Sequence, residues 1–179
     1  MKLFNVILTV CLILVAGLAI NSSNSYAGED QNLTVVKNLV DAFNNKDINA
    51  YTKIYSPDVK YHGSGGGDDL NLDQIKSFFS NVFKAYPNGK LTIEQLIAKD
   101  DEVVYRLMFN GKNTGTWMGM GDEPDMPATD KMVSCRSIGI AKFKDGKIVE
   151  EWENFDDLRM LKQLGVFPPP MPDASKMSN

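Results

Sequence analysis

The chain is poor in the residues that bind metals and form disulfides. Its 179 residues include one histidine, His62, and two cysteines, Cys11 and Cys135. Cys11 lies inside an apolar run near the N-terminus, so loss of that run would leave Cys135 alone and exclude an intrachain disulfide. A zinc site needs about four ligands, so one histidine and one cysteine are too few to build it from these residue types. We therefore expect no metal site.

Positive charge is also scarce. Lysine and arginine number 19 against 23 acidic residues, which gives a net charge of -4. The chain has no basic run and no basic patch interleaved with aromatic residues, so nucleic acid is not an expected partner. The glycines of residues 63–67 lack the lysine of a phosphate-binding loop, and Asp68 and Asp69 after them would repel a phosphate. We interpret this segment as a flexible loop.

The N-terminus contains the one long hydrophobic run. Residues 6–20 are almost continuously apolar, Lys2 precedes them, and Ser25-Tyr26-Ala27 follows them. This pattern predicts a secretory signal peptide over residues 1–27, cleaved after Ala27. The run is about 15 residues long, whereas roughly 20 are needed to span a bilayer, so we expect no stable membrane anchor. The mature protein would then be periplasmic or secreted.

The remaining chain changes from helical to strand periodicity near Lys90. Apolar spacing and capping residues predict helices over residues 31–45, 47–55, 72–83 and 157–163. Alternating residues and a hairpin turn at Asp145-Gly146 predict strands over residues 59–62, 91–98, 102–110, 132–143 and 147–155. Helices followed by antiparallel strands predict a single α+β domain over residues 28–166, with a curved sheet wrapped over helices. The proline-rich tail of residues 167–179 is predicted to be extended or disordered.

Two of the predicted strands have a face that mixes aromatic and polar residues. In the strand 102–110 this face comprises Val104, Arg106, Met108 and Asn110. In the last strand it comprises Ile148, Glu150, Trp152 and Asn154, and Asp156 continues it. Mixed faces are expected where apolar walls and a few polar groups line a pocket. A sheet with one solvent-exposed face would produce the same pattern.

Several segments, in this order and spacing, resemble a known family. The last strand and helix, GKIVEEWENFDDLRMLKQLG, resemble the closing segment of the SnoaL-like polyketide cyclase and ester cyclase family, within the nuclear transport factor 2-like superfamily. The opening helices LVDAFNNKDINAYTKIYSPDVKYH, the helix end KAYPNG, and the segments GKNTGTWMGM and PATDK extend the resemblance to about residues 33–165. It implies a cone: a strongly bent antiparallel sheet, helices across its open side, and a hydrophobic pocket inside. Because dimers are common in this superfamily, a homodimer is also implied.

The resemblance implies a catalytic role for Asp156. The cyclases use an aspartate as general acid and base to withdraw a proton next to a ketone, without a metal or organic cofactor, and Asp156 matches it. An apolar pocket would raise the pKa of this carboxyl and make it a competent base near neutral pH. An aspartate between a strand and a helix is equally a favoured N-cap. Both interpretations remain open at the level of sequence.

The sequence also departs from the family pattern. Asn113 aligns with the histidine of the family's G-T-H-x-G segment. Asparagine can donate a hydrogen bond to a developing oxyanion, but it cannot carry a proton, so acid–base catalysis by two residues is in question. Residues 121–126, GDEPDM, resemble an insertion that reshapes the pocket mouth or forms a solvated acidic loop, and Asp130 replaces a usual glycine.

Four further residues are candidates for binding a substrate. His62 ends the strand that faces the cavity in the family, and it either replaces the lost proton carrier or is an ordinary half-buried side chain. Trp117 and Trp152 are pocket walls or plain core residues. Arg106, if buried, would need to pair with Glu150 or Asp156.

The resulting functional hypothesis is an exported domain that binds a small, largely apolar or carbonyl-containing molecule, with acid–base catalysis of the cyclase, isomerase or hydrolase type by Asp156. A non-catalytic binding module and a protein-interaction domain of the same fold are the alternatives. Catalysis requires Asp156 to face the cavity, binding requires only the cavity, and an assembly role predicts a filled interior.

Overall fold

The computed structural model describes residues 28–64, 69–118 and 125–167. The predicted signal peptide, residues 65–68 of the glycine-rich loop, residues 121–124 of the insertion and the tail from residue 168 lie outside the described residues. None of the helices in the described ranges has the length and apolar character of a membrane-crossing helix.

Four helices of the described residues lie close to the predicted ranges, and capping residues mark several of their ends. They are an N-terminal helix, described over residues 28–44, and α2 (Ile48–Lys53), α3 (Leu72–Ala85) and α4 (Asp157–Leu164). Asp47 caps α2 by accepting hydrogen bonds from two backbone N–H groups. Asn71 and Gln74 form a capping box on α3. Gly165 ends α4 in the left-handed conformation, with a φ of 74°.

The five strands form one sheet in the order β1-β5-β4-β3-β2. Their bounds are β1 (Tyr55–His62), β2 (Lys90–Lys99), β3 (Glu102–Lys112), β4 (Met132–Lys144) and β5 (Lys147–Phe155). The neighbouring strands are antiparallel except β1 and β5, which run parallel. The prediction that a helix continues to Tyr55 was wrong, because Tyr55 already pairs with Ile148 of β5. Pro57 is tolerated within β1 because β1 is an edge strand.

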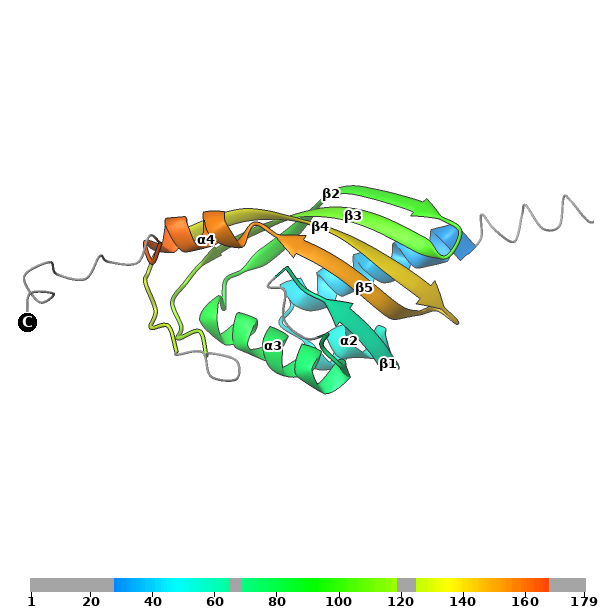
Figure 1. The fold of residues 1–179 in the computed structure, drawn as a ribbon, viewed down its shortest axis with the longest axis horizontal. Coiled ribbons are helices and arrows are strands. Elements are labelled where there is room, and N and C mark those ends of the chain that lie inside the picture. The colour runs from blue at the N-terminus through cyan, green and yellow to red at the C-terminus, as the bar shows by residue number, and fades with distance from the viewer. Residues whose placement is uncertain (1–27, 65–68, 119–124, 168–179) are drawn as a thin grey trace, which may run out of the picture.

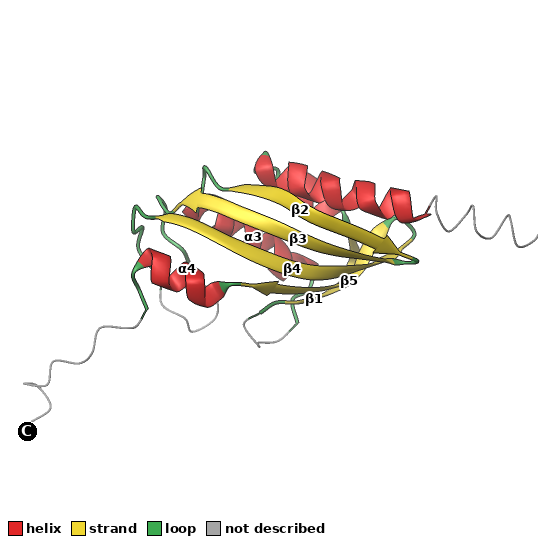
Figure 2. Ribbon diagram, turned by 90° about the horizontal axis from the view of Figure 1, so that it is seen from above, coloured by secondary structure: helices red, strands yellow, loops and turns green. Residues whose placement is uncertain are grey.

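The sheet arches over the helices, as Figure 1 shows for β2 to β5 above α2 and α3. Figure 2, seen from above, shows the outer face of the sheet, with α3 behind it and α4 at one end. The buried core lies between the inner face of the sheet and the helices, with residues such as Phe43, Ile75, Val103 and Ile148. This arrangement confirms the predicted α+β fold, here with a mixed sheet that is not closed.

A bulge in β5 decides which of its residues face the interior. Lys142 of β4 pairs with Glu150, but the next residue, Phe143, pairs with Ile148, so β5 contains one extra residue at this point. Ile148 is buried, and beyond the bulge Glu151 is the next buried residue. The mixed face predicted from simple alternation is therefore divided: Ile148 faces inward, whereas Glu150 and Trp152 face outward.

Candidate functional site

A cavity of about 430 Å³ lies between the inner face of the sheet and the helices. This volume is in the range of small-molecule sites. Its walls are mostly apolar and aromatic, and they come from the helices, including α2, α3 and α4, and from the strands β1 to β5. The aromatic lining residues are Phe43, Tyr51, Tyr61, Phe78, Phe79, Tyr86, Tyr105, Phe109, Trp117 and Phe155.

Glu151 is the most buried acidic residue in this cavity, with 2 % of its surface exposed. The Tyr55 hydroxyl donates a hydrogen bond to its Oε2, and the Tyr105 hydroxyl donates one to its Oε1, both at 2.7 Å. Tyr51 extends the network, since its hydroxyl lies 3.5 Å from that of Tyr55. Two phenols from different strands therefore hold both oxygens of one carboxyl group.

Glu153 is the second carboxyl on the same face of β5. Its Oε2 accepts a hydrogen bond from the Tyr61 hydroxyl at 2.5 Å, and Ser137 is a further hydrogen-bond partner. It is less buried than Glu151. Because side chains two residues apart in a strand point to the same side, the two carboxyl groups are neighbours in one apolar space.

The contact between Tyr105 and Glu151 depends on a glycine. Tyr105 on β3 pairs with Gly139 on β4, which in turn pairs with Glu153 on β5. A Cβ atom at position 139 would lie 2.1 Å from the Tyr105 hydroxyl oxygen. The phenol therefore reaches across β4 only because residue 139 has no side chain.

Burial and mutual repulsion change the proton affinity of this pair. Removal from water disfavours the charged form of Glu151, and the neighbouring Glu153 adds to this effect, so the pKa of Glu151 rises to about 7. The hydrogen bonds from Tyr105 and Tyr55 oppose the rise. Burial likewise raises the pKa of Glu153, against the hydrogen bond from Tyr61. The pair can therefore hold or release a proton near neutral pH.

Asp156 is exposed and is the N-cap of α4. Its Oδ1 accepts a hydrogen bond from the backbone N–H of Arg159 at 3.1 Å. It lines a surface depression together with residues of α4, and it is not among the residues that line the cavity. This position favours the capping interpretation, and catalysis by Asp156 stays a prediction for experiment.

Asn113 is fully buried, and all its side-chain hydrogen bonds are to the protein. Its amide donates to the backbone carbonyls of Ala85 and Gly115, and its Oδ1 accepts from the backbone N–H and the hydroxyl of Thr129. It fastens the segment after β3 to the end of α3 and does not line the cavity. The oxyanion role predicted for it has no support from this geometry.

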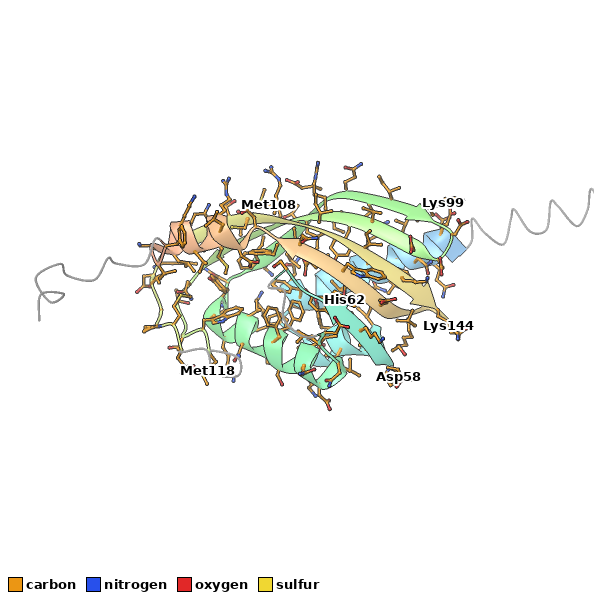
Figure 3. All side chains as sticks on the ribbon, viewed as in Figure 1. Asp58, His62, Lys99, Met108, Met118 and Lys144 are labelled. Atoms are coloured by element: carbon orange, nitrogen blue, oxygen red, sulfur yellow. The ribbon has the colours of Figure 1, made fainter. Side chains whose placement is uncertain are left out.

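His62 and Trp152 lie on the outer face of the sheet, and neither is among the residues that line the cavity. The parallel register places His62 of β1 opposite Trp152 of β5, and their rings stack with centroids 5.2 Å apart. His62 contacts Asp69 through Nδ1 at 2.6 Å and Glu150 through Nε2 at 3.0 Å. The hydrogen bond with Glu150, followed by that with Asp69, raises the pKa of His62. Figure 3 labels His62 near the end of β1.

Arg106 also points to the outer face, where it is half exposed. Its Nε lies 3.0 Å from Glu94 Oε2, and Arg136 shares the same carboxylate. Pairing with Glu150 or Asp156 was expected only for a buried Arg106, and Arg106 is not buried. Glu94 occupies a bulge in β2, between Ile93 and Gln95, which places its carboxylate near both arginines.

Trp117 is the one predicted binding residue that lines the cavity. Its ring meets that of Phe78 of α3 edge to face, with centroids 5.6 Å apart. An isolated bridge to Met126 holds its backbone. A direct role in substrate binding stays a prediction.

Glu151 and Glu153 were not predicted as site residues, although the sequence contains one signal for them. The tyrosines at positions 51, 55, 61 and 105 occupy positions that otherwise take apolar core residues. A buried tyrosine usually has a hydrogen-bond partner for its hydroxyl, so a group of them indicates buried acceptors. Within the described ranges, no group of three or more histidine, cysteine or acidic side chains is placed to hold a metal ion.

Comparison with known families assigns the chain. Residues 33–164 match the family model described as SnoaL-like polyketide cyclase, and the protein belongs to this family. Among the curated proteins compared with the chain, none matches it.

Solved structures share the nuclear transport factor 2-like fold. AclR from Streptomyces galilaeus is 24% identical, with a TM-score of 0.69 over 78% of this chain and 99% of AclR. A protein from Catenulispora acidiphila with a ketosteroid isomerase-like fold, in complex with trimethylamine, is 15% identical, with a TM-score of 0.60 over 73% of this chain and 92% of that one. An epoxide hydrolase of LEH-like type from M. tuberculosis is 14% identical, with a TM-score of 0.57 over 76% and 90%. At these identities the likeness establishes the fold alone.

Proposed function

We propose that this protein binds a small, largely apolar molecule in the cavity and transfers a proton on it with the Glu151–Glu153 pair. The observation that carries the proposal is a pair of adjacent carboxyl groups, held by phenols, in an otherwise apolar cavity. Membership of the SnoaL-like family and the small ligand held by a relative of the same fold support it. The reaction class would be of the cyclase, isomerase or hydrolase type, without an organic cofactor.

The two carboxyl groups have different roles in this proposal. Glu153 is the less buried and is the one that a ligand reaches first, so we assign it the role of general base. It would accept a proton from carbon next to a carbonyl group, while the electrons of the C–H bond move to the carbonyl oxygen. Glu151 controls the proton affinity of the pair. A base whose pKa lies near the working pH is the most effective one.

Exchange of carbon-bound protons for deuterium tests this proposal. The probe is 2-tetralone, an apolar ketone with acidic protons, followed in D₂O by proton NMR. We expect Glu153→Gln to reduce the protein-catalysed exchange by on the order of 100-fold, the usual share of a general base. Glu151→Gln should reduce it less, because it lowers the proton affinity of Glu153 and leaves the base in place. Loss of exchange in Asp156→Asn, with Glu153→Gln fully active, would instead support the family aspartate.

A non-catalytic binding module is the second candidate. Asn113, which replaces the family histidine, has its amide and carbonyl engaged by the protein, so it offers no polar group to a ligand. Saturable binding of 2-tetralone without any catalysed exchange would select this alternative. The cavity itself argues against an assembly role, which would require a filled interior.

Export and dimer formation complete the proposal. The leader pattern of residues 1–27 supports periplasmic or secreted localisation, and mass spectrometry of the exported protein should find an N-terminus at Gly28. Exposed apolar residues on the outer face of the sheet, Val104, Ile138 and Ile140, offer a surface for a second copy. Analytical ultracentrifugation should therefore give the mass of a dimer.

A further inference from the structure

The polar groups of the cavity have an unusual charge balance. Three acidic residues line it, Glu151, Glu153 and Asp157, whereas no lysine, arginine or histidine of the described residues does. The described histidine and arginine salt bridges to Glu150 and Glu94 lie on the outer face of the sheet. No positive charge of the described residues contributes to the pKa of Glu151 or of Glu153. The cavity thus concentrates negative charge without a protein counter-charge.

Aromatic rings lie next to this acidic group. The ring of Tyr51 is 4.5 Å from that of Phe79, between centroids, and Tyr61 meets Phe79 edge to face at 6.3 Å. The hydroxyl of Tyr61 binds Glu153, so the aromatic and acidic groups are continuous. Aromatic ring faces attract organic cations, and quaternary ammonium groups in particular. An apolar neutral ligand would use these rings but would leave the carboxyl groups unmatched.

A second observation indicates that the cavity is built for a ligand. Tyr86, which lines its wall, is 1 % exposed, and its hydroxyl has no hydrogen-bond partner among the described residues. Buried hydroxyl groups are nearly always paired in native proteins. Tyr86 packs on Phe109, four residues along β3 from Tyr105, a separation of about 13 Å along a strand. The cavity therefore has a second polar point besides the carboxyl groups, and a bound molecule could satisfy it.

We propose that the cavity binds an organic cation, a protonated or quaternary amine on an apolar body, with its positive charge against Glu151 and Glu153. This inference rests on the proposed function, because the ligand binds in the same cavity. It specifies in addition that the ligand is positively charged. A cation stabilises the ionised carboxyl groups, so its binding releases protons near neutral pH. Affinity for a cation of fixed charge therefore increases as the pH rises through the titration of the pair.

Two probes of equal shape test the inference on the full-length protein. Benzyltrimethylammonium carries a fixed positive charge, and neopentylbenzene is its uncharged isostere. We expect the cation to bind at least tenfold more tightly than neopentylbenzene at pH 8, and about tenfold more tightly at pH 8 than at pH 6, since the ionised fraction of a group titrating near pH 7 changes by that factor. NMR titration and calorimetry measure both.

The matched variants are Glu151→Gln and Glu150→Gln, the same change at adjacent residues on opposite faces of β5. Glu151→Gln should lower the affinity for the cation about tenfold and remove its pH dependence, without weakening neopentylbenzene. Glu150→Gln should leave both affinities unchanged. The comparison of the two probes on the unmodified protein stands even if Glu151→Gln fails to fold.

The contrary outcomes separate failure of the cation inference from failure of the proposed cavity-binding function. Equal affinities at pH 8, or tighter binding of neopentylbenzene, would overturn the cation inference and leave the proposed binding function intact. Equal effects of the two glutamate variants on cation binding would also overturn it, because the charge sensed would then be that of the whole surface. Failure of both probes to bind would contradict the proposed cavity-binding function as well.

Discussion

Glu150 and Glu151 are neighbours in β5, yet they belong to two different chemical environments. Glu150 lies on the outer face, where it pairs with His62 and is in contact with solvent. Glu151 lies on the inner face, 2 % exposed, and accepts hydrogen bonds from two phenols. The first carboxylate has a cationic partner, and the second has another carboxyl group, Glu153, beside it. The face of the sheet, and not the residue type, determines their chemistry.

This difference predicts a large pH dependence of stability from the inner carboxyl group. The pKa of Glu151 in the folded protein, about 7, lies above its value in the unfolded chain, about 4.5. Between these values the folded state binds more protons than the unfolded chain. The contribution of Glu151 to the free energy of unfolding is therefore fully present below pH 4.5 and is lost as the pH rises through 7. At pH 8 the ionised Glu151 therefore costs on the order of 3 kcal/mol.

The largest expected effect follows from removing this charge. Glu151→Gln should stabilise the protein by up to about 3 kcal/mol at pH 8 and by much less at pH 4, measured by urea unfolding. Glu150→Gln, the matched control, removes only a surface pair and should change stability by less than about 1 kcal/mol. Destabilisation by Glu151→Gln at pH 8 would mean that the inner carboxylate has a counter-charge that the described residues do not supply.

Substitution of Gly139 should disrupt the hydrogen bond between Tyr105 and Glu151 without changing a carboxyl group. The added Cβ of Gly139→Ala would displace the Tyr105 phenol from Glu151, at a cost of about 2 kcal/mol, as for an overpacked core. Loss of that donor should raise the pKa of Glu151 further, because the Tyr105 hydrogen bond lowers it. Gly28→Ala, where a Cβ meets nothing within 4 Å, is the control and should be close to neutral. Unchanged unfolding and unchanged titration in Gly139→Ala would contradict the phenol bridge.

The His62–Glu150 pair on the outer face should have the smallest effect on stability, and the pKa of His62 is simple to measure. His62 is the only histidine, so its ring gives a single set of NMR signals. Its pKa should lie above the usual 6.5, chiefly through Glu150, and Glu150→Gln should lower it. The stabilisation from this pair is present below pH 6.5 and is lost as the pH rises through the raised pKa. A normal pKa that does not respond to Glu150→Gln would show that the pair is absent in solution.

The sequence predicted the fold better than the site for a physical reason. Capping residues such as Asp47 and Gly165, and the turn at Asp145-Gly146, act locally, so the elements could be located from them. The family resemblance supplied the topology that local patterns do not contain. The strand at Tyr55 was missed because only its pairing with β5 overrides the helical pattern.

A shift of one residue in the register of β5 decides which of its side chains line the cavity. Simple alternation places Ile148, Glu150 and Trp152 on one face, but the bulge opposite Lys142 and Phe143 changes the face of every later residue. Alternation grouped Trp152 and Asp156 with Ile148, whereas Glu151 and Glu153 are the residues that line the cavity together with Ile148. A bulge depends on pairing with a strand elsewhere in the chain, so the residues of β5 alone do not reveal it.

The most direct test of the account is the pKa of Glu151 itself. Carboxyl-carbon NMR titration of the ¹³C-labelled protein, with Glu151→Gln to assign the signal, measures it without a substrate. A value near 7 would establish the inner carboxyl pair as a proton-transfer group at neutral pH. An ordinary value between about 4 and 4.5 would mean that water or a counter-charge reaches Glu151, and would contradict the proposed chemistry of the cavity.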